Sequence, residues 1–262
     1  MFNLSRFSLE GKVALVTGGS RGIGRASALG FAEAGADVAI ASRKLPDLEE
    51  VADEIRDTGR KALPVATHVG RLDEINKLVG MVMDEFGRID ILVNNAGCSP
   101  AFSTVLDAEE RLWDAIMNLN LKGLYFLSQA VARVMKEQGG GAIINLSSIE
   151  GYRPQFGTGI YSISKTAVKM VTKSMARDLA PYNIRVNAIA PGAIETRLLN
   201  NLWALLPEDQ ARAQKETLAE GIPLKRIGDP EEMVGAMIYL ASDASSYVTG
   251  TTILIDGGIL LR

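Results

Sequence analysis

A phenol and an ammonium stand four residues apart in the segment IYSISKTAVKM (160–170). Tyr161 and Lys165 occupy positions i and i+4, which lie on one face of a helix. A phenol normally titrates near pH 10, and a neighbouring ammonium favours its ionised form and so lowers its pKa. The pair therefore has the chemistry of a proton donor and acceptor that works near neutral pH.

Two further polar side chains accompany this pair. The segment INLSSIEG ends a predicted strand at Ser147 and Ser148, thirteen residues before Tyr161. The segment MNLNLKG offers Asn120 from a preceding helix. A Tyr-x-x-x-Lys spacing alone is frequent by chance. The presence of Ser148 and Asn120 as well favours a catalytic set of four side chains.

A glycine-rich loop, TGGSRGIGRA (17–26), follows the first apolar run. Its glycines at 18, 22 and 24 place no Cβ between the backbone and a ligand, and the free N–H groups of the helix that follows suit a pyrophosphate. The loop matches neither G-x-G-x-x-G nor a Walker sequence. Its position between a strand and a helix nevertheless predicts a dinucleotide site.

The end of the second predicted strand, IASRK, indicates which dinucleotide. Ser42 stands where an acidic residue would hold the ribose 2′-OH of NAD, and Arg43 follows it. An arginine can bind a 2′-phosphate through charge-assisted hydrogen bonds, and Arg21 adds a second cation in the glycine loop. NADP(H) is therefore favoured over NAD(H). The alternative for either arginine is a solvated surface charge.

The elements that must position these residues alternate along the chain. Apolar, β-branched runs are separated by segments with helical spacing, which predicts a parallel sheet covered on both faces. We expect one Rossmann-like, doubly wound α/β domain spanning residues 1–262, with right-handed crossovers. The predicted strands cover 12–18, 37–42, 61–67, 90–97, 142–148, 184–192 and 251–258.

The segment 197–224 departs from this alternation. It reads as a long amphipathic helical insertion with an exposed Trp203, and its place after a strand end predicts a lid over the site. The alternative is a surface helix that packs on the domain.

Composition excludes several classes of function. The formal net charge of −3 gives no general attraction to nucleic acid or anionic lipid, and no run is apolar enough for a signal peptide or membrane span. Cys98 is the only cysteine and His68 the only histidine, so neither an internal disulfide nor a usual zinc site is expected. We expect a cytoplasmic protein with no metal and no nucleic-acid or membrane partner.

Taken together, the motifs resemble the short-chain dehydrogenase/reductase family, with a lean toward 3-oxoacyl-thioester reductases. They occur in family order over nearly the whole chain: T-G-x-x-x-G-x-G (17–24), N-N-A-G (94–97), the Asn of LNLKG, the second Ser of SSIEG, Y-x-x-x-K (161–165) and P-G-x-x-x-T (191–196). The resemblance implies hydride transfer between a carbonyl and a secondary alcohol, with Tyr161 as acid and base.

The same resemblance implies the other catalytic roles. Lys165 would also hold the nicotinamide ribose hydroxyls, Ser148 would bind the carbonyl oxygen, and Asn120 would hold a water that links Lys165 to solvent.

The resemblance and the residue types together predict a larger group of side chains that bind the cofactor. His68 and Val69 would line the adenine, with an ordinary loop histidine as the alternative for His68. Asn94 is expected to brace the sheet. The cofactor-binding residues are predicted to be Gly18, Ser20, Arg21, Gly22, Ile23, Gly24, Ser42, Arg43, His68, Val69, Asn95, Ala96, Gly97, Tyr161, Lys165, Pro191, Gly192, Ile194 and Thr196.

The substrate is left open among a 3-oxoacyl thioester, a sugar or polyol, and a cyclic or steroid ketone. Its pocket is expected from residues 98–102, 150–157 and the 197–224 lid. Arg153 would bind an anionic group or serve as a plain surface charge. An apolar pocket wall or lid packing face is expected from Leu198, Leu202, Trp203 and Leu206.

Two further expectations concern the whole protein. Family members of this kind are usually homotetramers or homodimers, with interfaces from the helices at 109–137 and 160–181 and from the C-terminal segment. The alternative to an enzyme is a catalytically silent NADP-binding regulatory protein on the same fold.

Overall fold

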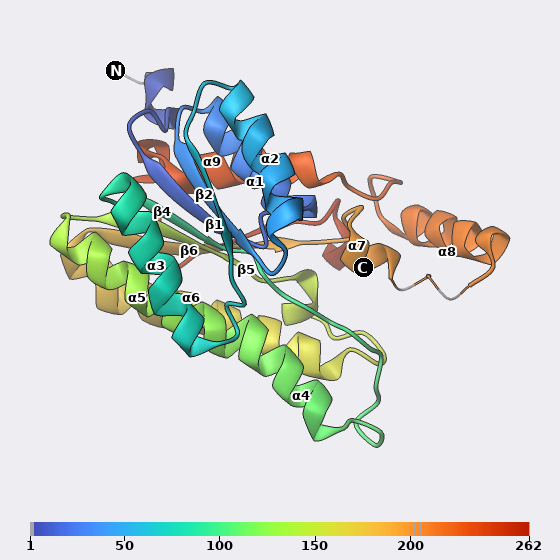
Figure 1. Ribbon diagram of the computed structural model, residues 1–262. Coiled ribbons are helices and arrows are strands. Elements are labelled where there is room, and N and C mark those ends of the chain that lie inside the picture. Colours follow the sequence, from blue (N-terminus) through green and yellow to red (C-terminus); the bar gives the residue numbers. More distant parts are fainter. Residues whose placement is uncertain (1–2, 202, 205, 262) are drawn as a thin grey trace.

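The computed structural model describes residues 3–201, 203–204 and 206–261. Within these residues, seven parallel strands form one central sheet in the order β3-β2-β1-β4-β5-β6-β7 (Figure 1). Each strand overlaps one predicted range. The strands are β1 (Val13–Thr17), β2 (Asp37–Ser42), β3 (Ala62–Ala66), β4 (Ile91–Asn94), β5 (Gly141–Leu146), β6 (Ile184–Pro191) and β7 (Thr252–Ile255).

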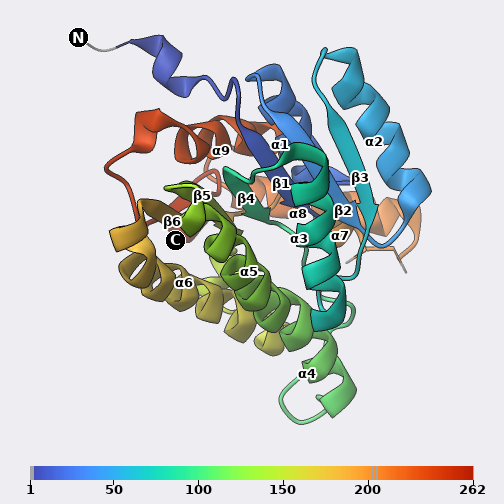
Figure 2. The same cartoon turned by 60° about the vertical axis from the view of Figure 1, so that its left-hand side comes forward.

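Helices cover both faces of this sheet, as predicted (Figures 1 and 2). Phe31, Leu48 and Met237 belong to the core under α1, α2 and α9, whereas Leu78 and Leu127 belong to the core under α3, α5 and α6. Burial of both faces explains why the strands are apolar throughout. The helices are α1 (Gly22–Glu33), α2 (Leu45–Asp57), α3 (Leu72–Phe86), α4 (Glu110–Met117), α5 (Leu124–Glu137), α6 (Gly159–Leu179), α7 (Arg197–Asn200), α8 (Glu208–Gly221) and α9 (Val234–Ala241).

The strand order reverses between β1 and β4. The chain runs outward from β1 to β2 and β3, and then returns to the other side of β1 as β4. Loops that leave the carboxyl ends of β1 and β4 diverge there, and such a switch point is where ligands bind in open α/β sheets. The fold therefore brings the glycine-rich loop and the N-N-A-G segment to one crevice.

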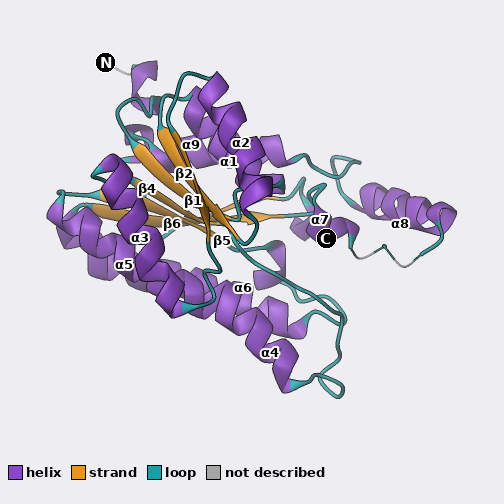
Figure 3. Ribbon diagram, in the orientation of Figure 1, coloured by secondary structure: helices purple, strands orange, loops and turns teal. Residues whose placement is uncertain are grey.

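The 197–224 segment differs from its prediction. Two helices, α7 and α8, replace the expected single helical insertion, and α8 projects away from the sheet (Figure 3). Pro207 precedes α8; its ring has no N–H and disfavours helical backbone in the residue before it, which separates the two helices. Trp203 is predicted to be exposed, but only 8% of its surface is exposed, and Lys215 of α8 lies over its ring. Leu202 lies outside the described residues.

No helix in the described part of the chain combines the length and apolar character needed to cross a membrane.

Candidate active site

Helix α6 carries the phenol and the amine side by side. Tyr161 and Lys165 lie in its first two turns, and both side chains are buried. The Lys165 Nζ donates a hydrogen bond to the Leu146 carbonyl at 2.7 Å and lies 5.6 Å from the centroid of the Tyr161 ring. The predicted pairing on one helix face is therefore present, and the end of β5 anchors its amine.

Ser148 reaches the same place from the end of β5. The Ser148 hydroxyl lies close enough to the Tyr161 phenol to lower its pKa, and it accepts the Glu150 backbone N–H at 3.1 Å. The neighbouring Ser147 hydroxyl donates to the Lys165 carbonyl at 2.9 Å, which ties the strand end to α6. These contacts bring together three of the four predicted catalytic side chains.

Asn120 lies in a π-helical turn, Asn118–Gly123, that joins α4 to α5. Its amide oxygen accepts the Cys98 N–H at 2.8 Å, and its amide nitrogen donates to the Cys98 carbonyl at 3.0 Å and the Ser164 hydroxyl at 3.2 Å. A Cβ on Gly97 would lie 3.3 Å from the Asn120 oxygen and 3.5 Å from the Lys165 Nζ. Asn120 thus lies beside Lys165, and its side chain is held by the loop after β4.

The pKa of Tyr161 differs from its prediction. Burial of the phenol raises its pKa well above the usual value, the Glu150 carboxylate and Cys98 raise it further, and the Ser148 hydroxyl lowers it. Lys165 does not produce the expected lowering, because its own ammonium is desolvated: burial lowers the pKa of Lys165 to about 8. Desolvation therefore outweighs the attraction between the two groups.

The glycine-rich loop has the shape of a phosphate cradle. A Cβ on Gly24 would lie 2.2 Å from the Gly18 carbonyl, and one on Gly18 would lie 2.6 Å from the Asn95 amide nitrogen. Helix α1 begins at Gly22, whose φ is 52°, and no side chain caps its N-terminus. The first N–H groups of α1 are therefore available to an anion such as a pyrophosphate.

The end of β2 has the features expected for the adenosine ribose. The Ser42 hydroxyl oxygen is buried without a hydrogen-bond partner, and the exposed Arg43 follows it. The positive charge of Arg43 acts to lower the pKa of the Cys98 thiol, although burial raises that pKa overall, so Arg43 lies within electrostatic reach of the loop after β4. Arg21 instead lies 3.7 Å from the Asp47 carboxylate. An uncapped helix, an orphaned hydroxyl and a cation together fit a phosphorylated dinucleotide.

The N-N-A-G segment is fixed to the glycine-rich loop. The Thr17 hydroxyl accepts the N–H groups of Asn95 and Ala96, each at 3.1 Å, and the Asn95 amide donates to the Thr17 carbonyl at 2.9 Å. Asn94 braces the sheet as predicted, since its amide donates to Asn145 at 2.9 Å.

His68 is held within its own loop. The His68 backbone N–H donates to the Glu74 carboxylate at 2.6 Å, and the ring Nδ1 of His68 accepts the Gly70 backbone N–H at 3.2 Å. Val69 is buried, and its carbonyl packs against Gly123 of the turn that carries Asn120. These contacts fix His68 at the start of the loop between β3 and α3.

The segment after β6 supplies the last predicted cofactor residues. The Gly192 N–H donates to the Ile255 carbonyl at 2.9 Å, and Ile194 forms an isolated bridge with Gly228. The Thr196 hydroxyl caps α7 by accepting the Leu199 N–H at 3.4 Å. This segment connects Pro191, at the end of β6, to the predicted lid.

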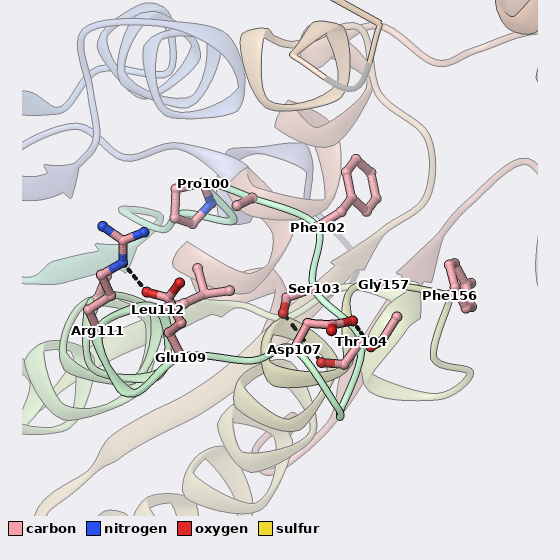
Figure 4. A pocket seen from close by; sticks show the side chains of 12 residues that line it. Pro100, Phe102, Ser103, Thr104, Asp107, Glu109, Arg111, Leu112, Phe156 and Gly157 are labelled. Carbon is pink, nitrogen blue, oxygen red and sulfur yellow. Dashed lines mark hydrogen bonds and ion pairs between the residues drawn. The ribbon is translucent and has the colours of Figure 1, made fainter.

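A cavity of about 620 Å³ lies beside the segments predicted to bind substrate (Figure 4). Phe102, exposed over 57% of its surface, and Phe156, at 89%, belong to its lining. The lining extends beyond the predicted ranges, onto the start of α4. The cavity is lined by Pro100, Ala101, Phe102, Ser103, Thr104, Asp107, Glu109, Arg111, Leu112, Ala115, Phe156 and Gly157.

Glu150 has contacts that the sequence did not predict. The sequence assigns this residue only to a predicted pocket segment, whereas its carboxylate contacts the start of α6 and raises the pKa of Tyr161. The available signal was an acidic residue two positions after Ser148, at a strand end. Across the described residues, no group of three or more His, Cys, Asp or Glu side chains could hold a metal ion.

Comparisons with known proteins agree with this geometry. A family model described as enoyl-(acyl carrier protein) reductase matches residues 18–260. The 2-dehydro-3-deoxy-D-gluconate 5-dehydrogenase of Escherichia coli is 42% identical over 260 residues, covering 99% of each chain. The 3-oxoacyl-(acyl-carrier-protein) reductase of Thermotoga maritima is 43% identical over 253 residues, covering 97% of this chain and 99% of its own.

Solved structures show the same fold. A gluconate 5-dehydrogenase from Burkholderia cenocepacia, in complex with NADP and tartrate, is 37% identical with a TM-score of 0.91, covering 99% of each chain. A 7α-hydroxysteroid dehydrogenase complexed with NADH and a 7-oxo bile acid is 31% identical with a TM-score of 0.90, covering 98% of each chain. With its parallel sheet and its buried Ser, Tyr and Lys, the chain belongs to the short-chain dehydrogenase/reductase family of oxidoreductases.

Proposed function

We propose that this protein is an NADP(H)-dependent oxidoreductase that interconverts a carbonyl and a secondary alcohol by hydride transfer, with Tyr161 as acid and base. The observation that carries the proposal is the gathering of the Ser148 hydroxyl, the Tyr161 phenol and the Lys165 amine, all buried, at the end of β5. A protein that only binds a dinucleotide needs no buried phenol beside a second hydroxyl.

The proposed mechanism assigns one task to each side chain. When bound, NADPH supplies the hydride. The Ser148 hydroxyl orients the carbonyl oxygen, and Tyr161 donates its proton to that oxygen during reduction or removes it during oxidation. Lys165 would hold the nicotinamide ribose hydroxyls, and Asn120 would hold a water that connects Lys165 to solvent.

The preference for NADP(H) rests on the end of β2. The unpartnered Ser42 hydroxyl and the Arg43 guanidinium suit a 2′-phosphate better than an acidic side chain would. One structural relative holds NADP and another NADH, so the fold alone does not select the coenzyme. We also propose cofactor contacts from Ser20, Ile23, His68, Val69, Gly97, Pro191, Gly192, Ile194 and Thr196.

The proposed substrate is a small carbonyl compound or the corresponding alcohol. It would bind between the 98–102 and 150–157 segments, under a lid formed by 197–224, in a single domain of residues 1–262. A 3-oxoacyl thioester, a sugar acid or polyol, and a cyclic or steroid ketone are the classes to test. The relatives include proteins named for the first two classes at 43% and 42% identity.

The proposal extends to assembly and location. We propose a homotetramer or homodimer in the cytoplasm, without nucleic-acid or membrane partners. Exposed apolar side chains on α4, α5 and α6 support a contact between copies; they are Trp113, Tyr125, Phe126, Ile163 and Met170.

The decisive experiment removes only the phenolic hydroxyl. Oxidation of NADPH is followed by absorbance with acetoacetyl-coenzyme A, 5-keto-D-gluconate and 2-decalone as substrates. We expect Tyr161→Phe to lower turnover by at least about 100-fold while NADPH affinity, measured by fluorescence titration, stays within about twofold. Tyr247→Phe, a fully exposed tyrosine, serves as the control and keeps wild-type turnover.

Two results would count against this proposal. Wild-type turnover in Tyr161→Phe would exclude the phenol as acid and base. Tight NADPH binding without reduction of any compound would favour the silent regulatory protein instead.

A further inference from the structure

Glu150 lies beside the two side chains proposed to act on the carbonyl oxygen. It belongs to the short helical turn Ile149–Gly151, directly after Ser148. Its backbone N–H donates to the Ser148 hydroxyl at 3.1 Å. Its carboxylate Oε2 accepts hydrogen bonds from the hydroxyls of Thr158 and of Ser162, the latter at 3.0 Å. One residue therefore contacts both Ser148 and the start of the helix that carries Tyr161.

We propose that Glu150 is a positioning residue that ties the Ser148 turn to helix α6 and sets a negative charge beside Tyr161, which favours carbonyl reduction over alcohol oxidation. This inference rests on the proposed function, because it concerns the same phenol.

The hydrogen bonds account for the positioning part. Thr158 is the residue before α6, and Ser162 follows Tyr161, so their two hydroxyls hold the first turn of the helix at one carboxylate oxygen. Both hydroxyl residues are buried. A serine hydroxyl has one donor and two acceptor sites, so accepting the Glu150 N–H leaves the Ser148 proton available. The Ser148 proton can then be directed toward the phenol or a carbonyl oxygen.

The charges around the phenol account for the directional part. Glu150 faces Tyr161 from the turn, Cys98 from the loop after β4, and Lys165 from α6 itself. After burial, the Glu150 charge is the largest cause that raises the pKa of Tyr161. A phenol that keeps its proton is ready to donate it to a carbonyl oxygen, whereas alcohol oxidation requires the ionised form.

Two cations lie near this turn. The Lys169 Nζ donates to the Gly151 carbonyl at 3.0 Å and lies 3.0 Å from the centroid of the Tyr152 ring. Arg153 is an exposed residue at the end of the same turn. The Thr158 and Ser162 hydroxyls that donate to the Glu150 carboxylate are neutral, so they do not balance its charge, which acts on the phenol.

Three variants separate the two parts of the proposal. Glu150→Gln removes the charge but keeps an amide oxygen that can accept both hydroxyls. Glu150→Ala removes the charge and the hydrogen bonds. Glu33→Gln, an exposed glutamate at the end of α1, is the control for the change in net charge.

The first measurement uses the free protein and no substrate. The ¹³Cζ resonance of Tyr161 is identified by its absence in Tyr161→Phe and is followed with rising pH while the protein stays folded. We expect the resonance to begin its titration about 0.5 to 1 pH unit lower in Glu150→Gln than in wild type and in Glu33→Gln. The same onset in all three proteins would overturn the directional part.

The second measurement uses the compound of the carbonyl panel that is reduced fastest, and its alcohol. We expect Glu150→Gln to raise alcohol oxidation about threefold at pH 8 and to leave reduction unchanged, and Glu150→Ala to slow both directions. Equal rates in Glu150→Gln and Glu150→Ala would overturn the positioning part. If Tyr161→Phe kept its turnover, the proposed function would fail, but the titration of the free protein would still report on Glu150.

Discussion

At the scale of single residues, the phenol of Tyr161 shows how burial and charge compete. The sequence places an ammonium one turn away and therefore predicts a lowered pKa. In the folded protein both groups leave water, and desolvation disfavours the charged form of each. The phenol consequently keeps its proton, and the amine of Lys165 loses its proton more readily than a free lysine.

Arg43 gives the residue-scale prediction. If its guanidinium binds a 2′-phosphate, Arg43→Ala loses one or two charge-assisted hydrogen bonds, and we expect NADPH affinity to fall about 10- to 100-fold. NADH has no 2′-phosphate, so its affinity is expected to change less than about twofold. Fluorescence titration with each coenzyme measures both affinities.

Lys44 is the matched control for that experiment. It is the next cation along the chain and is also exposed, so Lys44→Ala tests a general loss of positive charge. An equal loss of NADPH and NADH affinity in Arg43→Ala would contradict the assignment of the 2′-phosphate to Arg43.

At the scale of elements, the segment after β6 joins the cofactor crevice to the predicted lid. The Lys215 Nζ, on α8, donates to the Glu195 carboxylate at 2.9 Å and lies 5.4 Å from the centroid of the Trp203 ring. Glu195 lies between Ile194 and Thr196, two of the proposed cofactor contacts. The Lys215–Glu195 contact ties α8 to the backbone beside the proposed cofactor contacts Ile194 and Thr196.

The corresponding prediction concerns Lys215→Met. Both partners of the ion pair are more than a third exposed, so its loss costs at most about 1 kcal/mol. We expect amide hydrogen exchange in α8 to become at most about fivefold faster, with little change in the melting temperature of the whole protein. Hydrogen exchange measured by mass spectrometry reads out α8 separately from the sheet.

Arg212→Met provides the comparison on the same helix. Arg212 is an exposed cation of α8, three residues before Lys215. If both variants exchanged at the same rate, the Lys215–Glu195 contact would not be what holds α8.

At the scale of the whole molecule, two surfaces have different characters. The crevice at the carboxyl ends of β1 and β4 gathers polar and cationic groups, whereas α4, α5 and α6 present apolar side chains to solvent. Apolar patches of this kind mark contact sites between proteins. We propose that the crevice holds the cofactor and that the helical surface contacts another copy of the chain.

The whole-molecule prediction is therefore an assembled state. Light scattering after size exclusion is expected to give two or four times the chain mass of 28.1 kDa. Phe126→Glu combined with Met170→Glu, on α5 and α6, is expected to reduce that mass because it places charges on the apolar surface. Leu4→Glu changes an exposed apolar residue near the N-terminus and is the control. A wild-type protein of 28.1 kDa would contradict the predicted oligomer.

Local patterns in the sequence determined the sheet and the set of side chains at its edge. Apolar runs of four to eight residues mark the strands, because a parallel strand buries both of its faces. The glycine spacing after β1 and the Tyr161–Lys165 spacing are equally local, since each depends on one turn or one helix. The family, the parallel fold and the meeting of Ser148 with Tyr161 followed from these patterns.

Only the tertiary structure decided how those side chains behave. The raised pKa of Tyr161 depends on desolvation by distant segments, and the Glu150 contacts depend on how a loop meets the start of a helix. Trp203 is buried, with Lys215 of α8 over its ring, which the amphipathic pattern of one helix did not reveal. Spacing along the chain determines which residues can meet, whereas burial and long-range contacts determine their charge and environment.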